Sequence, residues 1–514
     1  MNGAEALLKT LGDLGVEACF SNPGTSEMQM VSAFDREPRV RPVLCLFEGG
    51  ATGAADGYAR MAGKPASTLL HLGAGLANGS ANLHNAKRAH SPIVNIVGEH
   101  ATYHRQYDAP LTSDIEGIAR PNSQWVRVAG TPDSIPELAV EAWEACQSGA
   151  GGVATLILPA DSAWSPTEVI GKVRPAPVRP APSSQAIEAA AKAVRAAKKP
   201  VLLLGSNALC EQGVAAAGRL ALVGVRVLID TFVRRHPRGA GRYGPDRMMY
   251  FGEMAIKDLE GVDLMVLAST KVPVAFFAYP DMPSVLAPQG CTPLTLATPE
   301  EDGGAALVAL ADLMSAPAQP VAALLDQPSA APSGAISAYT VGDSLCRHMP
   351  DHAIISEDAV SSGLPVFLQT RSARPHDWLC LTGGAIGQGI PAAIGAAVAC
   401  PDRKVLSLNG DGAAAYTLQG LWTMARENLD VTTIIFANRA YRILNIELAR
   451  TRSGQAGPKA RGLLDLGSPQ MDWVQLARGF GVEAVRCDDA ESFDKALAVA
   501  MREKGPRLIE AVIG

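Results

Sequence analysis

Short β-branched runs alternate with Ala-rich stretches of helical length along this whole chain. Examples are "VLCLFE" at residues 43–48, "VRVLID" at 225–230 and "KVLSLNG" at 404–410. Buried strands that alternate with helices are typical of parallel sheets that carry helices on both faces. The pattern therefore predicts an α/β fold, in which functional side chains lie just beyond the carboxyl ends of the strands.

Two proline-rich stretches interrupt this alternation, "VRPAPVRPAPSSQ" at 173–185 and "SAPAQPVAALLDQPSAAPSG" at 315–334. Proline disrupts helices and central strands, so both stretches read as linkers. A chain of 514 residues also exceeds what one hydrophobic core usually organises. We therefore expect three doubly wound parallel-sheet domains, at residues 1–170, 185–315 and 335–514.

Composition narrows the class of function. The net charge of −6 provides no basic surface for nucleic acid. No stretch is long and apolar enough to span a bilayer, and the first twenty residues lack the pattern of a signal peptide. The nine cysteines are widely spaced, with no CxxC pair. We expect a cytoplasmic enzyme with no membrane partner and no nucleic-acid partner.

An acidic residue between two glycines follows one predicted strand, in "SLNGDGAAAYT" at 407–417. The next predicted strand, "VTTIIFAN", ends in Asn438, 27 positions after Asp411. A strand, a helix and a parallel strand occupy about that length, so the two side chains should converge at adjacent strand ends. Oxygen ligands of this kind suit Mg²⁺, which completes its shell with water and phosphate oxygens. A bound diphosphate is therefore implied.

"GDG" followed by "AN" at this spacing resembles the signature of thiamine-diphosphate enzymes of the decarboxylase and acetolactate-synthase superfamily. The usual motif ends in two asparagines, and Ala437 replaces the first of them here. The resemblance implies that Mg²⁺ is held by Asp411, Asn438 and the backbone carbonyl of Ala440. It also implies cofactor contacts at Gly410, Gly412 and Ala413.

The resemblance covers the whole chain and gives each segment a role. The N-terminal domain would bind the aminopyrimidine ring of the cofactor, and the C-terminal domain would bind diphosphate and metal. The central domain is a spacer that holds FAD in some members; it has no GxGxxG fingerprint here, so FAD stays open without being indicated. The family geometry implies a homodimer with shared active sites, and usually a tetramer.

Glu48 opens the stretch "FEGGATGAADGYARMAGKP", which matches the family segment around its catalytic glutamate. A carboxylic acid bonded to a pyrimidine nitrogen favours the imino tautomer, which then removes the C2 proton of the thiazolium ring. Alone, Glu48 could equally be a helix-capping residue. Its presence argues against the glyoxylate-carboligase branch, and Asn78 is a further expected cofactor contact.

Two more stretches resemble cofactor-binding segments. In "LTGGAIGQGIPAAIGAA" the resemblance implies that the carbonyl of Gly384 contacts the aminopyrimidine and that Ile386 wedges between the two rings. In "SEDAVSSG" at 356–363, it implies that Ser361 offers a hydroxyl to the diphosphate.

The N-terminal stretches "CFSNPGTSEM" and "LLHLGAGLANG" resemble benzoylformate decarboxylase and its relatives more than biosynthetic acetolactate synthases. The resemblance implies that His71 lies beside the thiazolium ring, where an imidazole can bind the substrate carboxylate or carry a proton. Thr25 aligns with a serine that contacts substrate.

The substrate side departs from that pattern. Where the decarboxylases have a second histidine, "VPVAFFAYPD" places Ala278, with Tyr279 beside it. "YRILNIELAR" places Ile443 and Glu447 toward the substrate, and a carboxylate is an unusual lining for a phenyl ring.

The resulting hypothesis is a benzoylformate-decarboxylase-like enzyme that decarboxylates 2-oxo acids through a C2 carbanion and an enamine. An acetolactate-synthase-like carboligase is the first alternative, which the loss of the second histidine favours and His71 disfavours. A phosphonopyruvate- or sulfopyruvate-type decarboxylase is the second, with Arg439 or Arg442 as the clamp for a remote anion. A catalytically silent cofactor-binding sensor is a further alternative, against which Glu48 and the metal pair argue.

Overall fold

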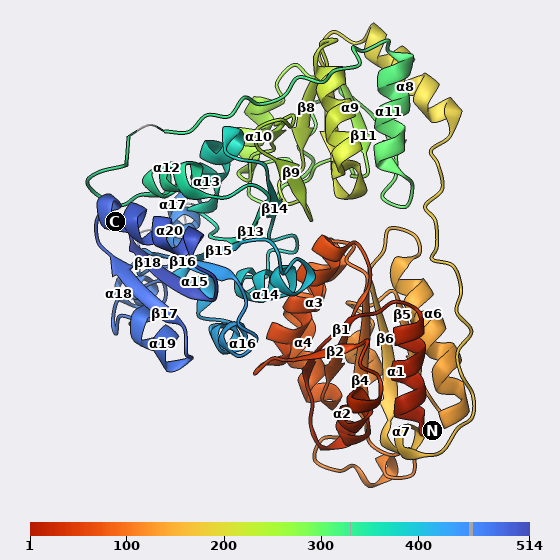
Figure 1. Ribbon diagram of the computed structural model, residues 1–514. Coiled ribbons are helices and arrows are strands. Elements are labelled where there is room, and N and C mark those ends of the chain that lie inside the picture. Colours follow the sequence, from red (N-terminus) through yellow and green to blue (C-terminus); the bar gives the residue numbers. More distant parts are fainter. Residues whose placement is uncertain (329, 452–455, 514) are drawn as a thin grey trace.

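The computed structural model describes residues 1–328, 330–451 and 456–513. It contains three sheets, each flanked by helices, and they occupy three corners of the molecule (Figure 1). The predicted α/β class with three sheet domains is confirmed. None of the helices in these described ranges combines the length and the apolar character needed to cross a bilayer.

The N-terminal sheet has six parallel strands in the order β2-β1-β3-β4-β6-β5. Its strands are β1 (Ala18–Asn22), β2 (Arg41–Leu44), β3 (Ala66–Leu70), β4 (Ile93–Glu99), β5 (Trp125–Val128) and β6 (Val153–Pro159). Its helices are α1 (Gly3–Asp13), α2 (Met28–Ala33), α3 (Glu48–Ala62), α4 (Leu72–Arg88), α5 (Ile115–Ala119), α6 (Ile135–Gln147) and α7 (Ala160–Trp164). Because β2 and β3 lead directly into α3 and α4, Glu48 and His71 lie at the carboxyl edge of this sheet.

The central sheet has five parallel strands in the order β10-β8-β7-β11-β12. They are β7 (Pro200–Leu204), β8 (Arg226–Ile229), β10 (Asp246–Arg247), β11 (Leu264–Ala268) and β12 (Thr292–Ala297). The accompanying helices are α8 (Ser184–Ala196), α9 (Glu211–Ala221), α10 (Gly252–Asp258) and α11 (Gly303–Leu313). Residues 167–183 lead into α8 as an extended segment without helix or strand, visible on the right of Figure 1.

The C-terminal sheet has seven strands in the order β17-β18-β16-β15-β13-β14-β9. They are β9 (His236–Arg238), β13 (Ala353–Asp358), β14 (His376–Leu379), β15 (Val405–Gly410), β16 (Val431–Ala437), β17 (Glu483–Cys487) and β18 (Arg507–Val512). The helices are α12 (Ala338–His348), α13 (Gly363–Gln369), α14 (Gly389–Ala399), α15 (Asp411–Ala414), α16 (Gly420–Arg426), α17 (Arg442–Arg450), α18 (Pro458–Gly462), α19 (Trp473–Gly479) and α20 (Ala490–Arg502).

One strand of this sheet comes from the central part of the sequence and departs from the expected parallel pattern. Strand β9 pairs with β14 in antiparallel register, with His376 opposite Arg238. It covers what would otherwise be the open edge of the sheet, where unpaired backbone groups invite association. The central segment is therefore joined to the C-terminal sheet by main-chain hydrogen bonds as well as by a linker.

Helices α3 and α14 join the N-terminal and C-terminal domains at the centre of the molecule (Figure 1). A Cβ atom on Gly57 would lie 2.0 Å from the carbonyl oxygen of Ala392, and one on Gly395 would lie 1.8 Å from that of Ala54. Only glycine permits this close approach of the two backbones. A continuous buried apolar cluster consequently extends from the N-terminal sheet through α14 into the C-terminal sheet.

Candidate active site

Glu48 is the first residue of α3 and lies half-buried at the carboxyl edge of the N-terminal sheet. Its Oε2 accepts a hydrogen bond of 3.0 Å from the side-chain amide of Asn78, which lies on α4 and is exposed. A Cβ atom on Gly75 would lie only 3.0 Å from Oε1 of Glu48. The carboxyl group is thus oriented by one neighbour while the glycine leaves room beside it.

His71 follows β3 and is held by a residue that the sequence analysis did not identify. Its Nδ1 lies 2.8 Å from Oε2 of Glu27, which follows Thr25 in a short 3-10 turn at Thr25–Glu27. Glu27 is 2% exposed, and the same Oε2 accepts the backbone N–H of Gly24 at 2.7 Å. Burial raises the pKa of Glu27, while Gly24 and His71 oppose that rise. Thr25 is exposed.

Glu48 and His71 both lie next to Gly75. A Cβ atom on this glycine would lie 3.0 Å from Oε1 of Glu48 and 3.4 Å from Cβ of His71. The two side chains therefore flank the same position on the first turn of α4. An acid and an imidazole so placed can serve a proton transfer at one bound molecule.

Asp411 and Asn438 lie at the ends of neighbouring strands, as their spacing predicted. Strands β15 and β16 pair in parallel, with Gly410 opposite Phe436. Asp411 is 2% exposed; its Oδ1 accepts the N–H of Gly412 at 2.8 Å, and its Oδ2 accepts that of Arg439 at 2.6 Å. Oδ1 of Asn438 accepts the N–H of Ala440 at 3.0 Å.

The residues around Asp411 fit a divalent cation with a phosphate ligand. Burial raises the pKa of Asp411, the N–H groups of Arg439 and Gly412 oppose that rise, and no cation in the described ranges forms an ion pair with it. A carboxylate, an amide oxygen and the Ala440 carbonyl are hard oxygen donors of the kind that Mg²⁺ prefers. A Cβ atom on Gly410 would find its nearest neighbour 4.0 Å away, so space is open beside this turn.

Gly410, Gly412 and Ala413 form that turn and the start of α15, and the structure places the last two in the interior. A Cβ atom on Gly412 would lie 2.5 Å from the ring of Tyr441, so this position requires glycine. Ser361 lies half-buried in the turn that follows β13, and its hydroxyl has no hydrogen-bond partner among residues that the structure describes.

The loop that leads into α14 is anchored by a buried aspartate, Asp358, which lies in the same stretch as Ser361 and was not among the predicted site residues. Oδ2 of Asp358 accepts the backbone N–H groups of Gly387, Gln388 and Gly389 at 2.7, 2.9 and 3.1 Å. Burial raises the pKa of Asp358 to about 7, and these N–H groups oppose the rise. The anchoring fixes the start of α14.

Within this loop Gly384 has a φ of +76°, which favours glycine, and Ile386 is half-buried. Asn85 on α4 holds both polar groups of the Ala385 backbone, accepting its N–H at 3.2 Å and donating to its carbonyl at 2.8 Å. The loop is thus held from both domains.

The four residues expected near the substrate lie on two facing segments. The hydroxyl of Tyr279 donates a hydrogen bond of 2.6 Å to Oε2 of Glu447 on α17, and Nη1 of Arg450 donates to Oε1 at 2.6 Å. Ala278 is exposed and Ile443 is half-buried. The carboxylate of Glu447 is therefore engaged by two neighbours rather than free to line a pocket.

The candidate residues form three groups in one chain. The first contains Glu48, Asn78 and His71; the second contains Asp411, Asn438 and Ala440; the third contains Tyr279 and Glu447. In the described part of the chain, no hydrogen bond or ion pair connects the first group to the second. Of the two arginines considered for a remote anion, Arg442 is exposed, whereas Nε of Arg439 is buried and has no hydrogen-bond partner within the described ranges.

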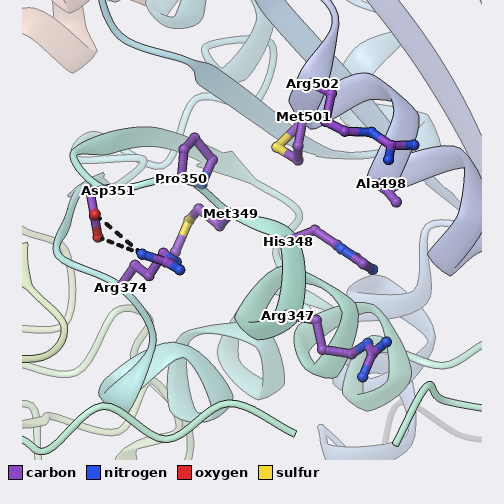
Figure 2. A pocket seen from close by; sticks show the side chains of 9 residues that line it. All are labelled: Arg347, His348, Met349, Pro350, Asp351, Arg374, Ala498, Met501 and Arg502. Carbon is purple, nitrogen blue, oxygen red and sulfur yellow. Dashed lines mark hydrogen bonds and ion pairs between the residues drawn. The ribbon is translucent and has the colours of Figure 1, made fainter. Parts of the chain in front are cut away.

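A cavity of about 450 Å³ lies away from these groups, between the ends of α12 and α20 (Figure 2). Most of its basic side chains are already paired. Nη1 of Arg374 lies 3.2 Å from Asp351, and Nε2 of His348 lies 2.9 Å from Asp494. None of the predicted site residues lines it, so the strand-end groups remain the candidate site.

His100 and His104, four positions apart, have ring centroids 5.5 Å apart. No group of three or more His, Cys, Asp or Glu side chains suited to a metal occurs in the described ranges.

Comparisons with known proteins agree with this arrangement. Residues 1–118 match the thiamine pyrophosphate enzyme, N-terminal TPP binding domain, and residues 363–511 match the C-terminal TPP binding domain. A protein of Mycobacterium tuberculosis named "Putative acetolactate synthase large subunit IlvX" is 49% identical over 100% of this chain and 99% of its own length. Benzoylformate decarboxylase of Pseudomonas aeruginosa is 28% identical over 96% of both chains.

Among solved structures, the thiamine diphosphate-dependent 4-hydroxybenzoylformate decarboxylase of Rhodococcus jostii RHA1 has a TM-score of 0.87 at 24% identity, covering 100% of this chain and 99% of its own. This likeness shows the fold alone. The extent of the 49% identical relative and the two matched binding domains show the family. The chain belongs to the thiamine-diphosphate-dependent enzymes that include acetolactate synthase large subunits and benzoylformate decarboxylases.

Proposed function

We propose that the protein is a Mg²⁺- and thiamine-diphosphate-dependent decarboxylase of 2-oxo acids. The observation that carries the proposal is the position of Glu48 and His71 on either side of Gly75. A carboxyl group can hydrogen-bond a nitrogen of the cofactor's pyrimidine ring, and an imidazole can serve the substrate. When bound, the cofactor supplies an electron sink for the bond that releases CO₂.

The residues of the chain have separate tasks in this proposal. Asp411, Asn438 and the carbonyl of Ala440 hold Mg²⁺ and through it the diphosphate, with Ser361 as a hydroxyl donor. Gly384 and Ile386 contact the rings of the cofactor. His71 binds the substrate carboxylate or carries the proton that completes an aldehyde, and Thr25, exposed beside it, contacts the substrate.

A second candidate is a carboligase that joins the first product to another 2-oxo acid or aldehyde. Two observations favour it: the name of the 49% identical relative, and the exposed Ala278 where related decarboxylases would have a second imidazole. The experiment is incubation with Mg²⁺, thiamine diphosphate and a panel of 2-oxo acids while CO₂ and organic product are followed together. Aldehyde in step with CO₂ supports the decarboxylase; a hydroxy ketone or acetohydroxy acid instead supports the carboligase.

The active site is proposed to form between two subunits, in a homodimer or a tetramer of such dimers. The lack of a hydrogen bond or ion pair between the Glu48 and Asp411 groups within the described part of one chain supports this. Glu48→Gln should keep cofactor affinity and lose most turnover, whereas Asp411→Ala should lose cofactor affinity. Co-expressing the two variants should restore about a quarter of wild-type activity, because half of the random dimers carry one intact site. No recovery would place both residues in the site of a single chain.

A further inference from the structure

The carboxylate of Glu27 is buried in the N-terminal domain, and among the described residues its one titratable partner is the imidazole of His71. Its side chain is 1% exposed, and the imidazole of His71 is 22% exposed. A Cβ atom on Gly98 would lie 1.6 Å from Oε1 of Glu27, so glycine at the end of β4 is required for this side chain to fit. Oε1 is buried and has no hydrogen-bond partner among the residues that the structure describes. The interactions of the carboxylate are therefore concentrated on Oε2.

Two nitrogen atoms lie within hydrogen-bond distance of Oε2. One is the backbone N–H of Gly24 at 2.7 Å and the other is Nδ1 of His71 at 2.8 Å. A Cβ atom on Gly24 would lie 2.3 Å from that Nδ1, so the imidazole ring packs directly against the backbone at this position. The ring therefore cannot tilt toward the turn, and the hydrogen bond to Glu27 sets its rotation.

An ionised carboxylate accepts hydrogen bonds and donates none, whereas a neutral imidazole carries its proton on one nitrogen only. We propose that Glu27 is a positioning residue that holds His71 in the Nδ1–H tautomer and presents a bare Nε2 to the substrate. The consequence for the proposed function is that His71 receives and returns its proton at Nε2. This inference rests on the proposed function for its catalytic meaning but not for its structural content.

The arrangement matters more in this chain if, as the resemblance to benzoylformate decarboxylase implies, Ala278 stands where a second imidazole would otherwise lie. Proton delivery then depends on His71 and on the residue that orients it. Loss of Glu27 should lower the rate of aldehyde formation by roughly ten- to a hundredfold, less than the roughly hundred- to ten-thousandfold attributed to general acid–base catalysis itself, because Glu27 acts through His71. Cofactor affinity should stay unchanged, because in the described ranges no hydrogen bond or ion pair connects Glu27 to Asp411, Asn438 or Glu48.

The tautomer can be measured directly by magic-angle-spinning NMR of the full-length protein labelled with ¹⁵N histidine, with His71→Asn identifying the His71 signals. We expect a protonated Nδ1 and a bare Nε2 in the wild type. Glu27→Leu removes the acceptor and should abolish this state, whereas Glu27→Gln keeps an amide oxygen that can accept the same proton and should preserve it. Glu37→Gln, a buried carboxylate paired with Arg39 in the same domain, is the matched control and should change nothing.

The second measurement is the steady-state kinetics of the protein with a 2-oxo acid that it converts to product. Glu27→Leu should lower kcat for aldehyde with little change in cofactor affinity, and Glu27→Gln should lose less. A wild-type His71 that carries its proton on Nε2, or a tautomer that Glu27→Leu leaves unaltered, would overturn the inference. If the NMR result is as expected but no 2-oxo acid is turned over, the positioning role stands and the proposed function fails.

Discussion

Two arginine–carboxylate clusters connect domains close to the candidate site, and they differ mainly in their access to water. In the first, Arg60 on α3 pairs with Asp56, and both side chains are 0% exposed. In the second, Arg450 on α17 pairs with Glu253 and Glu447, and the exposed fractions are 23%, 48% and 15%. The same kind of arginine–carboxylate ion pair therefore occurs in the protein interior in one cluster and where water reaches it in the other.

The buried cluster satisfies every polar group of its arginine. Nε and Nη2 of Arg60 donate to Asp56, Nη1 donates to the carbonyl of Cys380 at 2.7 Å and of Arg234 at 3.3 Å, and Nη2 also reaches Thr382 at 2.9 Å. Asp56 also accepts from Ser91, and from Gln388 at 2.7 Å. A buried ion pair is tolerated when its remaining donors and acceptors are paired in this way.

The Arg450 cluster is less tightly packed and more accessible to water. Helix α17 has no buried residue, and Arg450 packs over the ring of Phe251, with its guanidinium 4.1 Å from the ring centroid. The hydrogen bond from Arg450 contributes to a lower pKa of Glu253 against the effect of burial. Pairs of this kind contribute little stability because water competes for both partners. The comparison teaches that the first cluster holds the domains together, whereas the second positions a surface helix.

The largest expected effect comes from breaking the buried pair. Asp56→Ala leaves the Arg60 charge buried without a carboxylate, and we expect the free energy of unfolding to fall by about 3–5 kcal/mol. Urea unfolding at fixed protein concentration measures this. Asp258→Ala breaks a half-exposed pair with Arg226 and is the matched control, with an expected loss below about 1 kcal/mol. Equal losses of unfolding free energy in Asp56→Ala and Asp258→Ala would mean that the buried pair contributes no more stability than the half-exposed pair.

A smaller effect is expected from Gln388, which connects the buried cluster to the loop ahead of α14. Gln388→Met removes the hydrogen bond to Asp56 and should cost about 1.5–3 kcal/mol, the range for bonds to charged groups. Gln388 lies in the loop that Asp358 anchors, and thiamine diphosphate affinity should fall as well because this loop loses its side-chain hydrogen bond to Asp56. Titration of the cofactor followed by fluorescence checks this. Unchanged affinity would mean that the loop is held by Asp358 and Asn85 alone.

The smallest effect concerns the exposed cluster. Arg450→Ala should change the free energy of unfolding by no more than about 1 kcal/mol, while shifting KM for the 2-oxo acid because Glu447 and Tyr279 lose a neighbour. Raising the salt concentration from about 0.1 M to about 1 M should weaken this cluster and leave the Asp56–Arg60 pair unaffected. A stability loss as large as that of Asp56→Ala would contradict the comparison.

The strand-end positions of the candidate site could be predicted because they depend on local pattern. Strand periodicity and the spacing between Asp411 and Asn438 are properties of short stretches, and the parallel register of β15 and β16 brings the two residues to one edge. The same reasoning placed Glu48 after β2 and His71 after β3. The antiparallel strand β9 was not foreseen, because its partner β14 lies more than a hundred residues away in the chain.

The residues that orient the candidate groups were missed for a related reason. Glu27 stands in the stretch that contains Thr25, but its burial depends on Gly98 at the end of β4, and its partner His71 is 44 positions away. Asp358 stands in the stretch that contains Ser361, but the N–H groups it accepts belong to residues 29 to 31 positions later. The sequence next to Glu27 and Asp358 does not distinguish a buried carboxylate from a solvated one.

By itself the sequence determined the α/β class, the three sheets and the strand-end residues, because hydrophobic periodicity and turn residues act over a few positions. Only the tertiary structure decided that Glu27 binds His71, that Asp358 anchors the loop before α14, and that Asp56 and Arg60 are sealed between two domains. These contacts join residues of different elements and depend on which groups lose access to water. That loss is a property of the packed molecule.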